Sequence, residues 1–212
     1  MTMAAGTTGA ESAGDALVHD PDATTRSLAL RDLADLPYDP AAFGADLPVM
    51  LDTSAYIDQL KGRLPGRILR FVAGRSLLHA GTALQEIAIS IGMMDPGHPD
   101  TTRHRAPLLR LLETIRLRDC VAPSPAAWTE AGMLAGILAR TQFGLARAKG
   151  TLSAEQACCQ RGERRRLLND ALIFLTAQEQ GAVLVTANRR DMDLLLRFGR
   201  GARVLLYNPG AV

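Results

Sequence analysis

Four acidic residues, far apart along the chain, are placed where a parallel α/β fold would bring them together: Asp52, Glu86, Asp170 and Asp191. Asp52 directly follows the apolar run 49–51, and Asp191 follows a second apolar run by a short loop. Ligands of open parallel sheets bind beyond the carboxyl ends of the strands. Both aspartates are therefore expected at the same edge of the sheet.

Glu86 and Asp170 fall on predicted helices. Asp170 begins a stripe with Ile173, Phe174 and Ala177, whose spacing places them on one face of a helix. A carboxylate at the polar end of a stripe that faces the core points toward the edge of the sheet. The pattern thus predicts that the two helical acids join the two that follow strands.

Carboxylates gathered at one edge would repel one another by about 4 kcal/mol per close pair at an effective dielectric constant of about 20. Such a cluster is stable when a cation lies in it, and Mg²⁺ prefers carboxylate oxygens. One bound ion can activate water, and another can stabilise the leaving oxygen of a phosphate ester. The four acids are therefore candidate metal ligands and catalytic residues of a metal-dependent hydrolase.

Each acid, taken singly, also has a purely structural explanation. Asp52 fits the N-cap of a helix. Asn188 and Asp191 have the spacing of a capping box, with Asp in place of Glu. Glu86 and Asp170 fit solvated helix charges. The sequence leaves these explanations open, and it is the set of four that favours a metal site.

Short apolar runs alternate with helical stretches along most of the chain. Strands are expected over 49–51, 76–78, 120–121, 183–186 and 204–206, and helices over about 64–74, 82–91, 104–117, 125–147, 163–180 and 191–198. Short, continuously apolar strands separated by helices are typical of a parallel sheet covered on both faces. The sequence predicts an α/β fold with three layers, α/β/α, and a five-stranded parallel sheet.

The first 46 residues predict an N-terminal extension. Residues 1 to about 25 are rich in Ala, Gly, Thr, Ser and Asp and show no apolar periodicity, so we expect a flexible, largely unstructured leader. A short helix is expected over 27–33. The ordered domain is expected over 47–212, with helical insertions between about 98 and 162.

Composition narrows the function classes. The chain has 212 residues, 47% of them hydrophobic, and a net charge of +2, and its basic residues are arginines apart from Lys61 and Lys149. Three cysteines without a C-x-x-C pair argue against a disulfide framework or structural zinc. No secretory signal and no apolar run of about 18 residues is present, which favours a cytoplasmic protein without a membrane segment. The P-loop and dinucleotide-binding motifs are absent.

Four segments resemble the motifs of the PIN-domain ribonucleases, particularly the toxins of bacterial type II toxin–antitoxin systems. They are Val49–Ser54, Thr82–Ile87, Asn169–Ile173 and Val183–Asp191, in the order of the family, within about 47–207. The resemblance implies a five-stranded parallel sheet between helices, a Mg²⁺ or Mn²⁺ site and cleavage of RNA. The leader and the long interval between the second and third motifs depart from compact family members.

The resemblance also implies roles for particular residues. Asp52, Glu86, Asp170 and Asp191 match the metal-binding acids, Ser54 and Thr186 match polar positions near the site, and Asn188 shapes it. The implied partners are an RNA substrate, a small antitoxin protein and a second copy in a homodimer.

Two arginine groups are candidate phosphate contacts on their position alone. Arg189 and Arg190 lie beside the proposed site, and a further cluster, 161–166, stands at the expected start of a helix. The guanidinium group offers a planar fork of donors suited to phosphate. A solvated helix start is the competing explanation for 161–166.

The sequence thus predicts a metal-dependent endoribonuclease that hydrolyses RNA phosphodiester bonds, as the toxin of a toxin–antitoxin pair. Two alternatives stay open: a metal-dependent phosphohydrolase acting on small phosphate esters, and a non-catalytic regulatory or RNA-binding domain with a PIN-like fold. A covalent aspartyl-phosphate route is disfavoured, because it needs a second acid two residues after Asp52, where this chain has Ser54.

Overall fold

Five parallel strands form one sheet, in the order β3-β2-β1-β4-β5, in the computed structural model of the chain, which describes residues 12, 14, 17–160 and 162–210. The strands are β1 (Val49–Leu51), β2 (Leu77–Ala80), β3 (Cys120–Val121), β4 (Val183–Thr186) and β5 (Arg203–Leu206). All neighbouring strands run in the same direction, so their carboxyl ends share one edge. The predicted five-stranded parallel sheet is confirmed.

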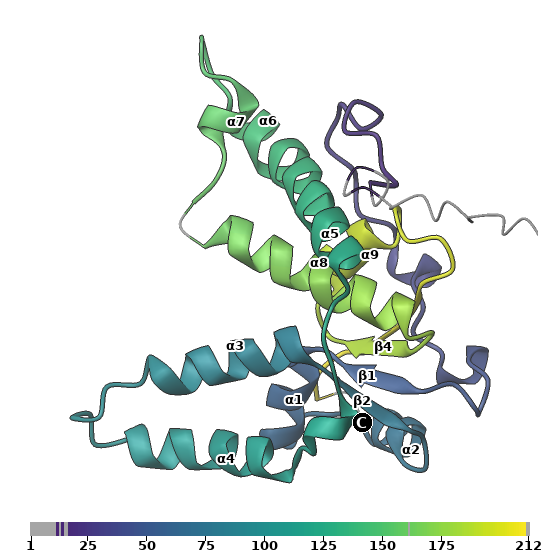
Figure 1. The fold of residues 1–212 in the computed structure, drawn as a ribbon, viewed down its shortest axis with the longest axis vertical. Coiled ribbons are helices and arrows are strands. Elements are labelled where there is room, and N and C mark those ends of the chain that lie inside the picture. Colours follow the sequence, from purple (N-terminus) through teal and green to yellow (C-terminus); the bar gives the residue numbers. More distant parts are fainter. Residues whose placement is uncertain (1–11, 13, 15–16, 161, 211–212) are drawn as a thin grey trace, which may run out of the picture.

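Helices cover both faces of the sheet. They are α1 (Thr53–Leu60), α2 (Gly66–Val72), α3 (Gly81–Gly92), α4 (Thr101–Thr114), α5 (Pro125–Leu138), α6 (Leu145–Arg147), α7 (Ala154–Ala157), α8 (Glu163–Glu179) and α9 (Arg189–Leu195). Helix α1 packs on β1 and β4 from one face, and α8 packs on β2 and β4 from the other, where it also contacts α5 and α9 (Figure 1). This is the predicted three-layer α/β/α arrangement.

The core explains why β1 and β4 are continuously apolar. Every residue of these two strands is buried, because they lie in the middle of the sheet and are covered on both sides. Leu51 of β1 pairs with Val185 of β4, and the backbone N–H of Asp52 donates to the Val185 carbonyl at 3.0 Å. This register places the first residue after β1 beside the end of β4.

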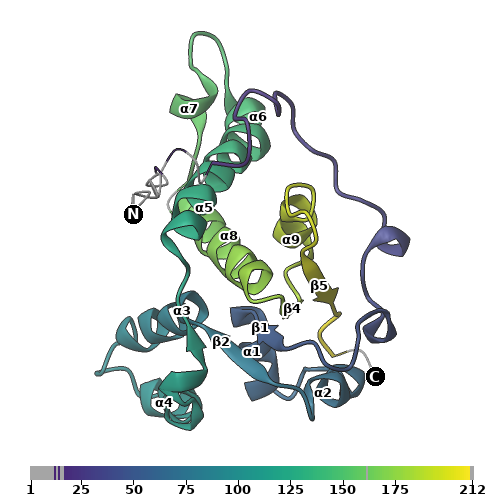
Figure 2. The same ribbon diagram turned by 45° about the vertical axis from the view of Figure 1, so that its right-hand side comes forward.

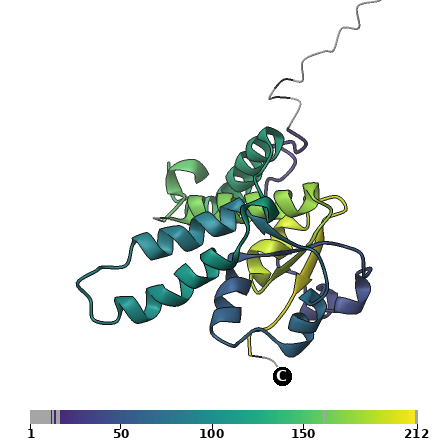
Figure 3. The same ribbon diagram turned by 60° about the horizontal axis from the view of Figure 1, so that its bottom comes forward.

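Two helical projections lie between β2 and β4 in the sequence. Helices α3 and α4 form a hairpin that extends away from the sheet (Figure 3). Helix α5 continues through a π-helical stretch, η4 (Ala139–Gly144), into α6, and α7 packs against η4 (Figure 1). Among the described residues, no helix is both long and apolar enough to cross a membrane.

The described part of the leader contains little regular structure but makes defined contacts. Its helical segments are the 3-10 turns η1 (Leu33–Asp35) and η2 (Pro40–Ala42). The leader runs along the α9 and β5 side of the molecule (Figure 2). The N–H of Val18 donates to Glu130 at 2.9 Å, and the N–H of Arg31 donates to Asp193 at 2.8 Å.

The helix predicted over 27–33 is wrong. Residues 27–32 are non-helical. Here the backbone bonds to the domain rather than to itself, because the Arg31 N–H reaches Asp193 and its carbonyl accepts from Arg189. The predictions for residues 1–11, 13, 15 and 16 lie outside the described residues.

Candidate functional site

Asp52 stands at the end of β1 with both carboxylate oxygens engaged by hydrogen-bond donors. Oδ1 accepts from the backbone N–H of Thr53 at 2.8 Å, and Oδ2 accepts from Ser54 Oγ and Thr186 Oγ1, each at 2.7 Å. The first contact makes Asp52 the N-cap of α1. The Thr186 contact joins the ends of β1 and β4, so Asp52 is both a cap and part of the predicted site.

The Asp52 carboxyl is 3% exposed, and burial raises its pKa. The donors from Ser54, Thr186 and Thr53 act in the opposite direction, since they stabilise the charged form, and the nearby charge of Glu86 raises the pKa again. The three donors therefore offset part of the cost of burying the charged carboxylate.

Asp170 lies on α8 and is 7% exposed, so the solvated-charge explanation is wrong for this residue. Its Oδ1 accepts from Asn188 Nδ2 at 3.2 Å, while its Oδ2 is buried without a hydrogen-bond partner. Burial, followed by the charges of Asp52 and Asp191, raises the pKa of Asp170 well above its ordinary value. The unpartnered oxygen marks where a further positive group would be most stabilising.

Asp191 lies in the first turn of α9 and its side chain is 2% exposed. Its backbone N–H donates to the side chain of Asn188 at 3.4 Å, which makes Asn188 the N-cap of α9. Its carboxylate Oδ2 accepts from Nη1 of Arg166, a residue of α8. Asp191 therefore already has a cationic partner within the chain.

Glu86 lies on α3 and is half-buried. Its carboxylate accepts from Thr53 Oγ1 at 2.5 Å and from Asn169 Nδ2 at 2.7 Å. It also lines a cleft of about 300 Å³ between α3 and α8, together with Ser90 and Arg165. Glu86 is thus held at the outer side of the cluster, next to open space.

The four acids act on one another, since the pKa of Asp170 is raised by the charges of Asp52, Asp191 and Glu86. The donor set consists of hard oxygens, as Mg²⁺ and Mn²⁺ require, and includes the unpartnered Asp170 Oδ2. Nevertheless, in the described part of the chain no three His, Cys, Asp or Glu side chains are already arranged to hold a metal ion. Two of the acids point to other partners: Asp191 to Arg166, and Glu86 to Thr53 and Asn169.

The supporting polar residues lie within this network. Ser54 Oγ also accepts from the N–H of Ala187 at 3.1 Å, and Thr186 Oγ1 accepts from the N–H of Asn188 at 2.9 Å. Ser54, Thr186 and Asn188 therefore fix the loop after β4 against the start of α1. Their part in a functional site stays a prediction.

Arg189 and Arg190 are engaged away from the acids. Arg189 Nη2 donates to the carbonyl of Arg31 in the leader at 3.1 Å, and the Arg190 guanidinium lies over the Phe143 ring, 5.6 Å from its centroid. Their role in phosphate binding stays a prediction.

Sequence reasoning did not single out three residues that contact the acids: Thr53, Asn169 and Arg166. Asn169 and Thr53 adjoin Asp170 and Asp52 in the sequence. Arg166 stood in the arginine cluster, but its pairing with Asp191 depends on the packing of α8 against α9. No local pattern reveals such a contact.

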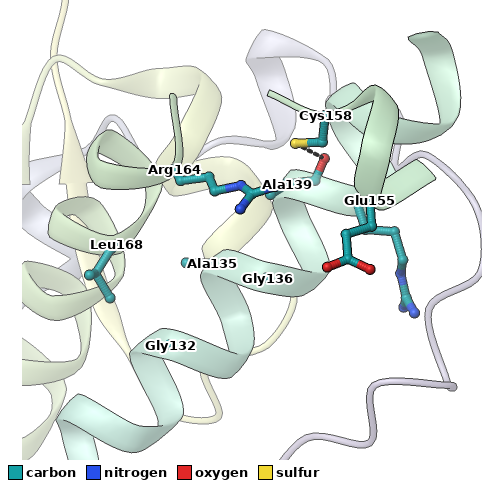
Figure 4. A pocket seen from close by; sticks show the side chains of 9 residues that line it. Gly132, Ala135, Gly136, Ala139, Glu155, Cys158, Arg164 and Leu168 are labelled. Atoms are coloured by element: carbon teal, nitrogen blue, oxygen red, sulfur yellow. Dashed lines mark hydrogen bonds between the residues drawn. The ribbon is translucent and has the colours of Figure 1, made fainter. Parts of the chain in front are cut away.

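A separate cavity of about 470 Å³ lies between α5, η4, α7 and α8 (Figure 4). Its walls include Gly132, Gly136 and Leu168, with Arg164 and Glu155 at its sides. None of the four acids lines it. This apolar cavity is therefore distinct from the acid cluster.

No protein-family model and no curated protein matches the sequence. Solved structures that are similar in fold include VapBC2 from Rickettsia felis bound to a DNA fragment from their promoter, at 15% identity over 76% of this chain and 100% of that chain, with a TM-score of 0.47. VapBC-1 from nontypeable Haemophilus influenzae is 17% identical over 76% and 98% of the two chains, with a TM-score of 0.44.

PAE2754 from Pyrobaculum aerophilum is 17% identical over 84% of this chain and 93% of that chain, with a TM-score of 0.34. These similarities concern the arrangement of strands and helices and carry no information on chemistry. The fold predicted from the sequence, a three-layer α/β/α arrangement around a five-stranded parallel sheet, is confirmed by the strand order and pairing of the structure itself.

Proposed function

We propose that the chain is a Mg²⁺- or Mn²⁺-dependent endoribonuclease. The observation that supports the proposal is a hydrogen-bond network at the carboxyl edge of the sheet, with Asp170 Oδ2 buried and without a partner. Through Thr53, Thr186 and Asn188, this network links the four acids Asp52, Glu86, Asp170 and Asp191. Acids placed this way are stabilised by a positive charge, and a cleft lined by Glu86 gives a substrate access to that acid.

The proposal gives two roles to the residues of the site, binding the ion and orienting its ligands. Asp52, Asp170 and Asp191, with Glu86 at the cleft, would hold the ion, while Ser54, Thr186 and Asn188 orient the first two carboxylates. A bound Mg²⁺ or Mn²⁺ would supply Lewis-acid activation of water and of the phosphodiester. Arg165 lines the same cleft and provides a positive charge for the RNA backbone.

The biological role that we propose is the toxin of a toxin–antitoxin pair, silenced by a small antitoxin protein and active as a homodimer. It rests on the four motifs that resemble PIN-domain toxins. Copurification of this chain with the product of a short reading frame next to its own would support the role. Free, uninhibited activity of the protein in the cell would contradict it.

The test is incubation of purified protein with mixed RNA in Mg²⁺ or Mn²⁺ and in EDTA, alongside Asp52→Asn. The Asn side chain keeps an oxygen for the N-cap but removes the charge. We expect cleavage that needs the metal and that falls at least 100-fold in the variant, a loss typical of a group that acts at the reaction centre.

Asp58→Asn is the matched control. Asp58 is also 3% exposed and lies on α1, but it pairs with Arg63 and Tyr207 and not with the acid cluster. The rate of RNA cleavage by Asp58→Asn, corrected for the folded fraction measured by circular dichroism, should equal that of wild type. Equal cleavage by wild type and Asp52→Asn would refute the proposal, and hydrolysis of small phosphate esters without RNA cleavage would favour the phosphohydrolase alternative.

A further inference from the structure

The side chains of three consecutive arginines at the start of α8, Arg164 to Arg166, lie in three different environments. Arg164 lines the apolar cavity between α5 and α8 (Figure 4), Arg165 lines the cleft beside Glu86, and Arg166 contacts Asp191. Successive helical side chains diverge by about 100°, so neighbours in sequence point in different directions. Of these three arginines, Arg166 is the one that pairs with an acid of the cluster.

Arg166 is placed as a counter-charge to more than one carboxylate. Its Nη1 donates to Asp191 Oδ2, and its charge also acts on Asp170. Arg166 and Asp170 are four residues apart on α8, so they lie on the same face of the helix. In a cluster of four acids, this guanidinium supplies the positive charge that a divalent cation would otherwise supply.

The two partners differ in exposure. The Asp191 side chain is 2% exposed, whereas the Arg166 side chain is 44% exposed. Asp191 is fixed by its position in α9, where Asn188 caps its backbone N–H. The half-exposed Arg166 side chain can turn into solvent, where its charge is hydrated. The buried Asp191 side chain cannot reach solvent. Any exchange of partners at this contact must therefore move the arginine.

We propose that Arg166 is a built-in competitor of the divalent cation: it neutralises Asp191 in the metal-free protein and releases it when the ion binds. The inference rests on the proposed function, since it assumes that these acids bind a metal. It also accounts in part for the absence of a metal cage among the described residues, because Asp191 is held by Arg166, as Glu86 is by Thr53 and Asn169. The apparent metal affinity of the protein is then set by how readily this ion pair opens.

The experiment measures Mn²⁺ binding to the full-length protein without RNA, by the electron paramagnetic resonance signal of free Mn²⁺. Arg166→Gln should bind Mn²⁺ about tenfold more tightly than wild type, because the competing cation is gone. The control Arg165→Gln removes the same charge from the next residue and should change the affinity by less than about twofold. Arg164→Gln, which points into the apolar cavity, should behave as wild type.

Thermal unfolding gives a second measurement. Without metal, Arg166→Gln should unfold at a lower temperature than Arg165→Gln, and saturating Mn²⁺ should raise its midpoint more than it raises that of wild type. Arg166→Lys keeps a positive charge beside Asp191. It is the variant to measure if Arg166→Gln does not fold without metal. It loses the planar fork, so it should hold Asp191 more weakly and bind Mn²⁺ more tightly than wild type.

The outcomes separate this inference from the proposed function. An unchanged or weaker Mn²⁺ affinity in the Arg166 variants overturns the inference, and so does an equal gain in Arg165→Gln, which would show a general charge effect. If wild type and Asp52→Asn bind Mn²⁺ equally, or neither binds it, the proposed metal site itself fails.

Discussion

Thr186 Oγ1 donates a hydrogen bond of 2.7 Å to Asp52 Oδ2, and so joins the ends of the two central strands. Thr186 is fully buried, so no water replaces this donor when it is removed. Thr186→Val preserves the shape of the side chain but leaves Asp52 Oδ2 with Ser54 alone. We expect a loss of about 1–3 kcal/mol in the free energy of unfolding and weaker Mn²⁺ binding.

Urea denaturation and Mn²⁺ titration measure these two effects. Thr176→Val is the matched control, because Thr176 is equally buried but donates to the carbonyl of Leu172 within α8. It should leave Mn²⁺ affinity unchanged. If Thr186→Val binds Mn²⁺ as wild type does, the hydroxyl serves stability alone.

Asn188 has two contacts that substitution can separate. Its Oδ1 caps α9 and its Nδ2 donates to Asp170 Oδ1. Asn188→Ser keeps a good N-cap but loses the amide donor, whereas Asn188→Ala loses both. We expect Asn188→Ser to retain stability within about 0.5 kcal/mol, and Asn188→Ala to lose about 1 kcal/mol.

RNA cleavage completes this comparison. Both variants should lose activity to a similar degree, because both leave Asp170 without its one amide donor. Full activity in Asn188→Ser would show that the cap is the whole contribution of this residue and would remove it from the site.

The raised pKa of Asp170 predicts how stability depends on pH. In the folded protein this carboxyl holds its proton more tightly than in the unfolded chain, where its pKa is near 3.8. Above that value the unfolded state binds fewer protons than the folded state, so the metal-free protein loses stability as pH rises through the raised folded pKa. The pKa of Asp52 is shifted in the same direction.

Thermal midpoints in EDTA, measured from about pH 4 to about pH 8, test this dependence. The midpoint of wild type should fall with rising pH relative to that of Asp170→Asn, whose side chain has no proton to lose. Saturating Mg²⁺ should reduce the difference, since the cation stabilises the deprotonated carboxylate. Parallel pH curves for the two proteins would contradict the prediction.

Arg31 of the leader forms an ion pair with the buried Asp193 of α9. The Asp193 side chain is fully buried, and Arg31 donates to it through both its backbone N–H and its Nε. Arg31→Ala removes the guanidinium, while the backbone N–H of residue 31 and Arg197, 4.0 Å away, stay as partners of Asp193. Breaking a buried pair costs about 3–5 kcal/mol, and we expect a loss near the lower end because Arg197 stays.

Chemical denaturation measures that loss. Arg26→Ala is the control, since Arg26 lies in the same leader but is exposed. Its free energy of unfolding should stay within about 0.5 kcal/mol of wild type. An equally small effect of Arg31→Ala would mean that Arg197 and the backbone N–H of residue 31 are sufficient to stabilise Asp193.

Local sequence patterns predicted the elements of the sheet well. The strand over 120–121 and the strand over 183–186 have the predicted bounds, and the helix over 125–147 appears as α5, η4 and α6 in continuous succession. The strand over 183–186 is fully buried and the strand over 120–121 half-buried, while α5 is strongly apolar, so the apolar pattern follows burial in these segments. Helix α9 begins two residues earlier than predicted, at Arg189, because Asn188 is its N-cap.

Contacts between residues far apart in the chain could not be predicted from the sequence. The stretch 27–33 looks helical locally, but its backbone groups bond to Asp193 and Arg189 instead. Likewise, the arginine run at the start of α8 has no periodicity that separates Arg166 from its neighbours. Which side chain meets a buried acid depends on how helices pack in space, and a single sequence contains no direct record of that.

The leader also determines where the chain can be shortened. A fragment starting at residue 47 would lack Val18 and His19, the partners of Glu130, and Arg31, the partner of Asp193, and both acids are buried. Glu130 would lose these two partners, and Asp193 would keep only Arg197, 4.0 Å away. We therefore expect a stable fragment to retain Val18, His19 and Arg31, and we expect proteolytic loss of this segment to weaken α9, the helix that carries Asp191.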